Sequence, residues 1–412
     1  MRVLHTSDWH IGKQIGNMRI PDVHEAFMGF LRQIVIDRQV DVLLISGDVF
    51  DTRSPSAQSQ KMFYGHMFDL LQTTGLSHIV VTSGNHDSPA VLSMLARIFS
   101  PYGLHIVTSC NPADELLTLT DRNGKPALQV LAAPFLRERE IRNSQGEAST
   151  QDLRAALSNA IAAHFRHAQE LMEAKFDPLL PTIGMAHLSA AGSSAESIDK
   201  GAGVRDLYIG GLDTVNPSIF PAFCDYMALG HIHLPHVVAQ NEAIRYCGSP
   251  ISLGFGEHGR KQMLLIDFDG KTPKVSPVAI PCFLSLLQAT GTGLDEILTK
   301  IDTYAKERKN LTDLVRPTTY VEIIYKGEKP LPSLKKDVQD HLSALDGEWV
   351  LSQIKSLRSL GKLTAQDASI RLDELTPEIV FEQIVGKDNA LRYKPLFDLA
   401  YAAALAAKAE ET

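Results

Sequence analysis

Short apolar runs and helical patterns alternate along the first two thirds of this 412-residue chain. Six of the runs are continuous rather than alternating, which is typical of strands that are covered on both faces. They are Met1–Thr6, Val42–Ser46, His78–Thr82, Leu128–Ala132, Thr182–Ala186 and Tyr226–Leu229. The pattern predicts sheet structure buried between other layers.

Helical periodicity fills several intervals between these runs. Apolar residues fall on one face of the segment that follows Pro21, and further helices are predicted at Ser56–Leu71, Ala90–Phe99 and Thr150–Ala174. Beyond residue 235 the pattern changes to short strands separated by turns, which favours antiparallel pairing. These strands are predicted at His236–Gln240, Ala243–Cys247, Met263–Phe268 and Lys274–Ile280. We therefore expect a layered α/β domain over residues 1–280.

The last third of the chain predicts two further parts. Residues 281–363 have the pattern of a smaller α+β unit, with helices at Leu294–Lys306 and Ser333–Ala344 and strands at Tyr320–Ile324 and Trp349–Ile354. Residues 364–412 predict a linker and two C-terminal helices, Pro377–Val385 and Asn389–Lys408. A helix pair too small for its own core should dock on a partner protein or on this chain's own smaller unit.

Composition and charge narrow the class of protein. The chain is 44% hydrophobic and 21% charged, with a formal net charge of −8, which excludes a disordered or collagen-like protein. Because the balance is acidic, any nucleic-acid contact must come from local patches or bound cations. The four cysteines form no CxxC pair, and no apolar run approaches the ~20 residues of a membrane helix. We expect a soluble protein of the reducing cytoplasm, without membrane contact.

Five polar motifs stand at the ends of apolar runs. They are Asp8-Trp9-His10, Gly47–Asp51, Gly84–Asp87, His187 and Gly230–His233. Ligands of open α/β sheets bind beyond the carboxyl ends of the strands, so we expect these motifs to meet at one edge. A D-x-H triplet alone is common by chance, and the His231/His233 pair alone is compatible with an ordinary strand end. Found together and in order, the motifs favour one shared site.

The residue types in these motifs suit a binuclear metal centre. Carboxylates, imidazoles and an amide oxygen are ligands that Mn²⁺, Mg²⁺ or Fe²⁺ prefer. Asp48, on a tight glycine turn, is suited to bridge two ions ~3.5–4 Å apart, and two such cations clamp a phosphoryl group and activate a water. We expect His86 to stabilise developing charge or to protonate the leaving oxygen, and Asp51 to orient His86.

The set of motifs resembles that of the calcineurin-like metallophosphoesterase superfamily. Within it, the chain is similar to the nuclease subunits of the bacterial double-strand-break repair nucleases, the SbcD family. The segments that carry this similarity are LHTSDWHIGK, GDVFDT, PFLRERE and RYCGSPISLGF. Phosphatases of the superfamily typically carry GDxxDRG and GNHE, whereas this chain has Thr52-Arg53 and Asp87 at the corresponding places. The resemblance covers the first 280 residues closely, and the rest by size and order of elements.

The resemblance implies a fold, a ligand set and an activity. The fold is a four-layer α/β metallophosphoesterase fold, two mixed β-sheets between helices, with a smaller α+β capping domain and C-terminal helices. The implied activity is that of a Mn²⁺-dependent 3′-to-5′ exonuclease on duplex ends and an endonuclease on single strands and hairpins, in DNA repair and recombination. His86 is the implied catalytic histidine. The implied ligands are Asp8, His10, Asp48 and His233 for one ion, and Asp48, Asn85, His187 and His231 for the other.

The resemblance also implies partners. The C-terminal helices would bind the base of an SbcC-like coiled-coil ATPase, two copies of the chain would form a homodimer within a heterotetramer, and the capping domain would select the DNA. Arg137, Arg139 and Arg142 are candidates for phosphate contacts, although a solvated loop with Glu138 and Glu140 is an equal alternative. A small-substrate phosphodiesterase or phosphatase is the alternative enzyme for the same site chemistry, and an inactive scaffold is the non-enzymatic one.

Overall fold

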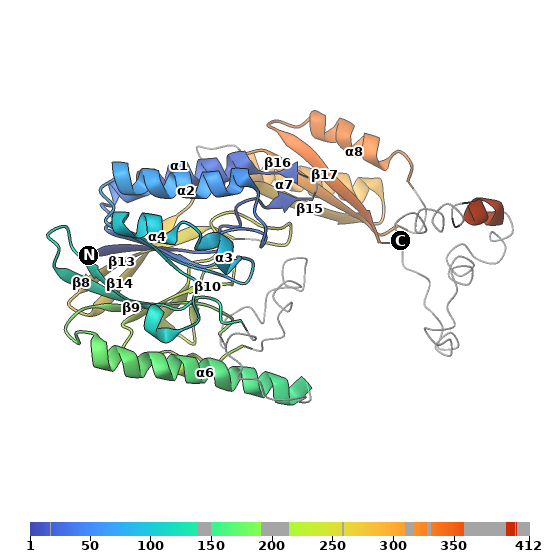
Figure 1. The fold of residues 1–412 in the computed structure, drawn as a ribbon. Coiled ribbons are helices and arrows are strands. Elements are labelled where there is room, and N and C mark those ends of the chain that lie inside the picture. The colour runs from blue at the N-terminus through green and yellow to red at the C-terminus, as the bar shows by residue number, and fades with distance from the viewer. Residues whose placement is uncertain are drawn as a thin grey trace.

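The computed structural model describes residues 1–137, 150–190, 214–309, 317–327, 331–357 and 393–401, apart from positions 17, 258 and 400. Two six-stranded sheets lie face to face between helices, and a smaller three-stranded unit stands at one end (Figure 1). Within the residues described, no helix has both the length and the apolar character needed to cross a membrane.

The first sheet has the strand order β14-β13-β1-β4-β5-β6. Strands β1, β4, β5 and β6 are parallel, while β13 runs antiparallel to β1 and β14 antiparallel to β13. The strands are β1 Arg2–Thr6, β4 Val42–Ser46, β5 His78–Thr82, β6 Leu104–Val107, β13 Gln262–Asp269 and β14 Thr272–Ala279. A separate two-stranded hairpin, β2 Gln14–Ile15 and β3 Met18–Arg19, follows β1.

The second sheet has the order β11-β12-β10-β9-β8-β7 and is also mixed. Its inner strands are parallel, and antiparallel pairing is confined to β7 with β8 and β11 with β12. The strands are β7 Leu116–Thr120, β8 Pro126–Ala132, β9 Thr182–His187, β10 Tyr226–Gly230, β11 His236–Val238 and β12 Asn241–Tyr246. The antiparallel stretch predicted beyond residue 235 is therefore two hairpins, one in each sheet.

Helices cover the outer face of each sheet and complete four layers (Figure 1). Helices α1 (Pro21–Asp37) and α2 (Ala57–Thr73) pack on the first sheet, and α6 (Thr150–Lys175) packs on the second. Leu43 and Ile45 of β4 belong to the helix-side core, whereas Val42 and Leu44 belong to the core between the sheets. Burial on both faces explains why these strands are continuous apolar runs, and the predicted fold class is confirmed.

The helix predicted at Ala90–Phe99 is wrong as a single helix. The segment forms two single turns, α3 (Pro89–Leu92) and α4 (Ala96–Phe99), followed by the 3₁₀ turn η1 (Ser100–Tyr102). The Tyr64 hydroxyl of α2 lies 3.3 Å from the Val91 carbonyl and 2.9 Å from the Leu92 carbonyl. This tertiary contact engages carbonyls at the end of the first turn. Two further 3₁₀ turns are η2 (Pro112–Asp114) and η5 (Pro217–Ile219).

The smaller unit, residues 281–357, is a parallel three-stranded sheet in the order β15-β16-β17. Its elements are β15 Ser285–Gly291, α7 Leu294–Lys309, β16 Thr319–Tyr325, α8 Leu334–Ser343 and β17 Trp349–Ser356. Strand β15 was missing from the sequence prediction. Leu286 and Tyr320 pack against the core between the first sheet and its helices. The Ser352 hydroxyl of β17 donates to the Ile15 carbonyl at 3.3 Å. The smaller unit thus contacts the β2–β3 hairpin.

The C-terminal prediction is only partly within the described residues. Positions 393–399 and 401 are helical, inside the helix expected at Asn389–Lys408. The helix expected at Pro377–Val385 lies outside the described residues. Tyr393, Leu396 and Leu399 are exposed by 40%, 65% and 72%. This helix therefore presents apolar side chains to solvent.

Candidate metal centre

The carboxyl ends of strands from both sheets meet at one edge of the molecule. The Ser46 hydroxyl at the end of β4 donates to the Ala228 carbonyl of β10 at 3.0 Å. A Cβ at Gly230, the last residue of β10, would lie 1.8 Å from the Ser46 carbonyl oxygen. Because glycine has no Cβ, the two strand ends can approach closely, and the motifs that follow them come together.

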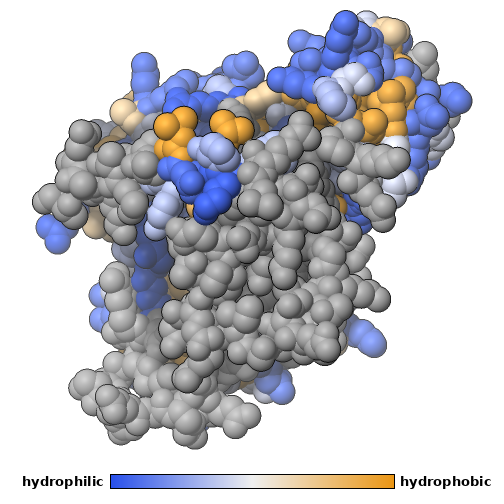
Figure 2. All heavy atoms as spheres, turned by 90° about the vertical axis from the view of Figure 1, so that its right-hand side faces the viewer, coloured by the Kyte–Doolittle hydropathy of each residue, from blue (hydrophilic) through white to orange (hydrophobic). Residues whose placement is uncertain are grey.

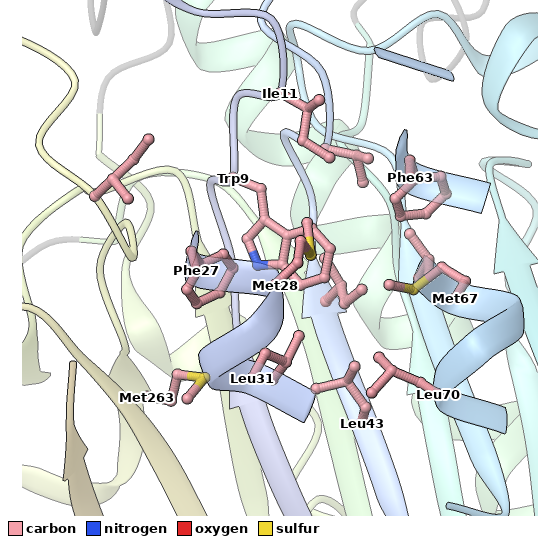
Figure 3. Close-up of a cluster of buried hydrophobic side chains, with 14 of the residues drawn as sticks. Trp9, Ile11, Phe27, Met28, Leu31, Leu43, Phe63, Met67, Leu70 and Met263 are labelled. Atoms are coloured by element: carbon pink, nitrogen blue, oxygen red, sulfur yellow. The ribbon is translucent and has the colours of Figure 1, made fainter. Parts of the chain in front are cut away.

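The D-x-H motif is anchored by the apolar residues that alternate with its polar ones. Trp9 and Ile11 point into the core between the helices and the first sheet (Figure 3). The Trp9 ring packs edge-on against Phe27, with centroids 5.5 Å apart. Asp8 and His10 have φ angles of 54° and 45°, a left-handed backbone that L-residues rarely adopt. The anchored core residues hold this unfavourable backbone, so the two side chains project towards the edge.

The structure brings together all seven predicted ligands. Two groups of them have ligand atoms within 4.8 Å of one another: Asp8 with His10 and His233, and Asp48 with His187 and His231. We call Asp8, His10 and His233 the first group, and Asp48, His187 and His231 the second group. The Asn85 Oδ1 atom borders the second group, 3.1 Å from His187 Nε2 and 3.1 Å from His231 Nδ1. Asp48 also lies near the first group, since its Oδ2 atom is 3.5 Å from His10 Nε2.

Hydrogen bonds leave imidazole nitrogens available at the centre. The Nδ1–H of His187 donates to the Ser46 carbonyl at 2.9 Å, and that of His10 donates to Asp51 Oδ1 at 3.2 Å. The Nε2 atom of each ring is therefore the nitrogen that would offer its lone pair to a cation once it carries no proton. Within the described residues, His10 Nε2 is buried without a hydrogen-bond partner. A buried orphan nitrogen beside carboxylates fits a divalent cation that prefers nitrogen and oxygen ligands.

The charges of the second group also fit a cation. Burial alone would lower the pKa of His187, but the Asp48 carboxylate 3.3 Å away outweighs it and raises that pKa to about 9. Burial likewise opposes the charge on Asp48, yet His187 holds the pKa of Asp48 well below its usual range. Without a cation, a proton on His187 thus balances the buried Asp48 carboxylate, and a divalent cation would take the place of that proton.

His86 and Asp51 are linked, but through the main chain. The Nδ1–H of His86 donates to the Asp51 carbonyl at 2.9 Å, and the His86 main-chain N–H donates to Asp48 Oδ1 at 2.9 Å. A ring nitrogen of His86 also lies within 4.8 Å of ligand atoms of His10 and Asp48, so these three side chains form a further group that could hold a metal ion.

The Asp51 carboxylate has other partners. It pairs with His10 and with Lys13, whose Nζ is 3.1 Å away. Burial alone would raise the pKa of Asp51. His10 and Lys13 outweigh burial and lower this pKa to about 2. Asp51 thus orients His86 with its carbonyl and His10 with its side chain.

Arg137 requires a correction. We expected it to contact phosphates, but its side chain is buried and its Nη2 donates to the carbonyls of Gly84 and Asp87 at 3.1 and 2.6 Å. Arg137 therefore holds the main chain of the loop Gly84–Asp87, which we call the GNHD loop. Arg139 and Arg142 lie outside the described residues.

Several supporting residues were not assigned by sequence reasoning. Asp87, the last residue of GNHD, accepts hydrogen bonds from the N–H groups of Gly84 at 2.8 Å, Val49 at 3.1 Å and Phe50 at 2.9 Å. It therefore connects the GNHD loop to the loop Gly47–Asp51, the GDxxD motif. The Ser7 hydroxyl donates to Asp8. Glu257 Oε1 accepts the Nδ1–H of His233 at 2.9 Å. The signal for Asp87 was its place in the motif, whereas Glu257 lies outside all five motifs.

Comparisons with known proteins agree with this geometry. Residues 1–235 match the family model of calcineurin-like phosphoesterase, and residues 282–388 match that of the Type 5 capsule protein repressor C-terminal domain. A protein of Escherichia coli (strain K12), named as the SbcD component of the nuclease SbcCD, is 32% identical over 389 residues, covering 93% of this chain and 92% of its own. Proteins of the same name from Rhodobacter capsulatus and Bacillus subtilis are 33% and 30% identical, covering 74% and 65% of this chain and 76% and 66% of their own.

Proposed function

The chain belongs to the calcineurin-like phosphoesterases and, within them, to the family of SbcD nuclease subunits, and on this premise we propose that it is the DNA-cleaving subunit of an SbcCD-type nuclease. The observation that supports this best is the position of Asp48, whose Oδ2 atom lies 3.3 Å from His187 Nε2 within the second group and 3.5 Å from His10 Nε2 of the first group. A carboxylate shared by two ligand groups is typical of binuclear phosphoesterase centres.

Each group would hold one divalent cation. Asp8, His10, Asp48 and His233 would hold one, and Asp48, Asn85, His187 and His231 the other. We propose Mn²⁺ for both, with Mg²⁺ or Fe²⁺ compatible with the same oxygen and nitrogen ligands. When bound, the two ions supply Lewis acidity toward the scissile phosphate and lower the pKa of a bound water.

His86 would act on the leaving oxygen. Its Nδ1–H is committed to the Asp51 carbonyl, so its Nε2 is the atom that carries a transferable proton when the ring is protonated. The His10 ring lies edge-on to His86, with centroids 4.8 Å apart, which limits the rotation of the His86 ring. We therefore assign His86 to charge stabilisation and proton donation, and not to the metal ligands.

The proposed reactions are 3′-to-5′ exonuclease cleavage of duplex ends and endonuclease cleavage of single strands and hairpins, in DNA repair and recombination. The test is an assay with Mn²⁺ in which end-labelled duplex DNA is compared with p-nitrophenyl esters and cyclic nucleotides. Release of nucleotides from the labelled ends supports the proposal. Cleavage of the small esters without any release from DNA would favour the small-substrate phosphodiesterase or phosphatase.

The proposed domain organisation assigns residues 1–280 to the nuclease domain, 281–363 to the capping domain and 364–412 to the linker and C-terminal helices. The contact of Ser352 with the hairpin after β1 supports a cap that lies beside the catalytic edge. We propose that this cap selects which DNA reaches the centre. The exposed apolar residues of the helix at 393–399 support docking on an SbcC-like coiled-coil ATPase.

A homodimer within a heterotetramer completes the proposed assembly, which acts in the cytoplasm. Helix α2 and the segment from α3 to η1 expose Phe68, Met94, Ile98 and Tyr102 by 45 to 61%. Seen from the side of the smaller unit, hydrophobic residues also gather in separate places among hydrophilic ones in the upper part of the molecule (Figure 2). Because large exposed apolar side chains mark association surfaces, these residues of α2 and of the segment from α3 to η1 support self-association.

A further inference from the structure

An ion pair outside the five motifs holds His233. Glu257 Oε1 accepts the Nδ1–H of His233 at 2.9 Å, while Glu257 Oε2 accepts from Lys261 Nζ at 2.8 Å and from the Leu253 N–H at 3.1 Å. The side chains of Glu257 and Lys261 are 10% and 9% exposed. A carboxylate with three donors in so little solvent is fixed in position.

Lys261 fixes the backbone of the same histidine. Its Nζ lies 3.4 Å from the His233 carbonyl and donates to the Ser249 hydroxyl at 2.9 Å. The Ser249 N–H donates to that same carbonyl at 3.1 Å. The Glu257–Lys261 pair therefore determines both the ring orientation of His233 and the position of its main chain.

His10, the other histidine of the first group, is held in the same way. Its Nδ1–H donates to the Asp51 carboxylate, which pairs with Lys13. In the second group, His187 donates to the neutral Ser46 carbonyl instead. A carboxylate behind an imidazole makes its free nitrogen a stronger metal ligand than a neutral acceptor does. The histidines of the first group thus have a carboxylate behind the ring that His187 of the second group lacks.

We propose that Glu257, held by Lys261, is a positioning residue that keeps His233 Nε2 free and oriented, and so raises the affinity of the first group for a divalent cation. The inference rests on the proposed function, because the cation is one of the two proposed there. Glu257 reaches the cation only through His233 and touches no substrate.

The substitution E257Q is the sharpest probe. A carboxylate accepts at both oxygens, whereas an amide has one acceptor and one donor nitrogen. In either orientation the amide nitrogen of E257Q opposes a donor, either His233 Nδ1–H or the Lys261 and Leu253 donors. The variant keeps the size of the side chain, so it perturbs the hydrogen bonds without leaving a cavity.

The experiment is a calorimetric titration of the metal-free, full-length chain with Mn²⁺. We expect E257Q to bind one of the two ions about 10 to 100 times more weakly and the other with unchanged affinity. K261M should weaken the binding of the same ion by a smaller factor. If E257Q does not fold, the Mn²⁺ affinity of K261M tests the proposal in its place. E242Q is the matched control, because Glu242 has an exposed side chain paired only with Arg245 among the described contacts.

A second readout separates positioning from a purely structural role. The Mn²⁺ concentration for half-maximal DNA cleavage should rise in E257Q, while the rate at saturating Mn²⁺ recovers towards that of the wild type. A folded E257Q with wild-type Mn²⁺ affinity would overturn the proposal, whatever its thermal stability. A wild-type chain that cleaves no DNA, together with weakened Mn²⁺ binding in E257Q, would support this inference and contradict the proposed function.

Discussion

At the scale of single residues, His86 is set apart from the other histidines of the centre. Its main-chain N–H is bound to Asp48 and its Nδ1–H to the Asp51 carbonyl, so its place is fixed by the two loops rather than by neighbouring imidazoles. Although it borders His10 and Asp48, neither the first group nor the second group includes it. Removing its ring should therefore leave both groups complete.

We predict that H86A binds Mn²⁺ like the wild type and loses most of its cleavage activity. General acid–base groups contribute about 10²- to 10⁴-fold to the rate, and a loss of that size is expected. The measurements are a Mn²⁺ titration and the initial rate on end-labelled duplex DNA. Full activity in H86A would remove His86 from the mechanism, and loss of one Mn²⁺ would reassign it as a ligand.

Arg137 gives a second prediction at this scale. R137M should lower the free energy of unfolding by about 2–3 kcal/mol, because the buried carbonyls of Gly84 and Asp87 lose a charged donor. Urea unfolding of the metal-free chain measures this. R122M is the control, since the side chain of Arg122 is 62% exposed and its loss should change stability little. If R137M instead has wild-type stability and binds DNA more weakly, the original prediction that Arg137 contacts DNA phosphates would be supported.

The meeting of the seven candidate ligands at one edge could be predicted because each motif is local and follows a strand. Asp8 and His10 are two residues apart, and their placement needs no knowledge of the distant chain beyond the edge at which strands end. Glu257 and Arg137 could not be assigned in this way. Glu257 acts on His233, 24 residues away, and Arg137 acts on carbonyls of the GNHD loop, 50 and 53 residues away. No local pattern records such contacts.

At the scale of elements, strands buried on both faces were predicted and pairing across long distances was not. Strand β4 was predicted with its observed bounds because all five of its residues are buried. Where α3 ends, the Leu92 carbonyl accepts a hydrogen bond from Tyr64 of another helix. Strands β13 and β14 pair as a hairpin, but their assignment to the first sheet depends on β1, where Arg2 pairs with Asp267. Local periodicity carries no information on such partners.

The two sheets are joined by a buried polar contact with a pH dependence. His5 of β1 lies with its Nδ1 atom 3.1 Å from the Tyr226 hydroxyl of β10. Burial lowers the pKa of His5 to about 3, from an ordinary value of 6.5. Below pH 6.5 the unfolded chain binds a proton that the folded chain does not, so this contribution to stability is present above pH 6.5 and is lost as the pH falls towards 3.

We therefore predict that H5N flattens the acid side of the stability profile. Between pH 7.5 and pH 5, the free energy of unfolding of the wild type should fall by about 2 kcal/mol through His5 alone. The fall in H5N should be smaller by about the same amount. Urea unfolding of the metal-free proteins at both pH values measures the difference, with the other buried histidines common to both. An identical loss in the two proteins would show that His5 is protonated in the fold.

At the scale of the whole molecule, the net charge of −8 means that the protein as a whole repels DNA. Any attraction to DNA must then come from local positive patches, bound cations or a partner protein. The helix at 393–399 presents apolar side chains to solvent, and none of the described contacts of the metal centre involves it. Partner binding and metal binding should therefore be separable.

We predict that deleting residues 376–412 spares Mn²⁺ binding and abolishes co-purification with the coiled-coil ATPase. The double variant L396D/L399D should weaken co-purification in the same way, because it places charges on the exposed apolar face. D398N is the matched control, since Asp398 lies on the same helix with its side chain 58% exposed. Undiminished co-purification of the deletion variant would contradict the assignment of these helices to the partner. If the helix docks instead on the smaller unit of its own chain, the double variant will lower thermal stability and still bind the ATPase.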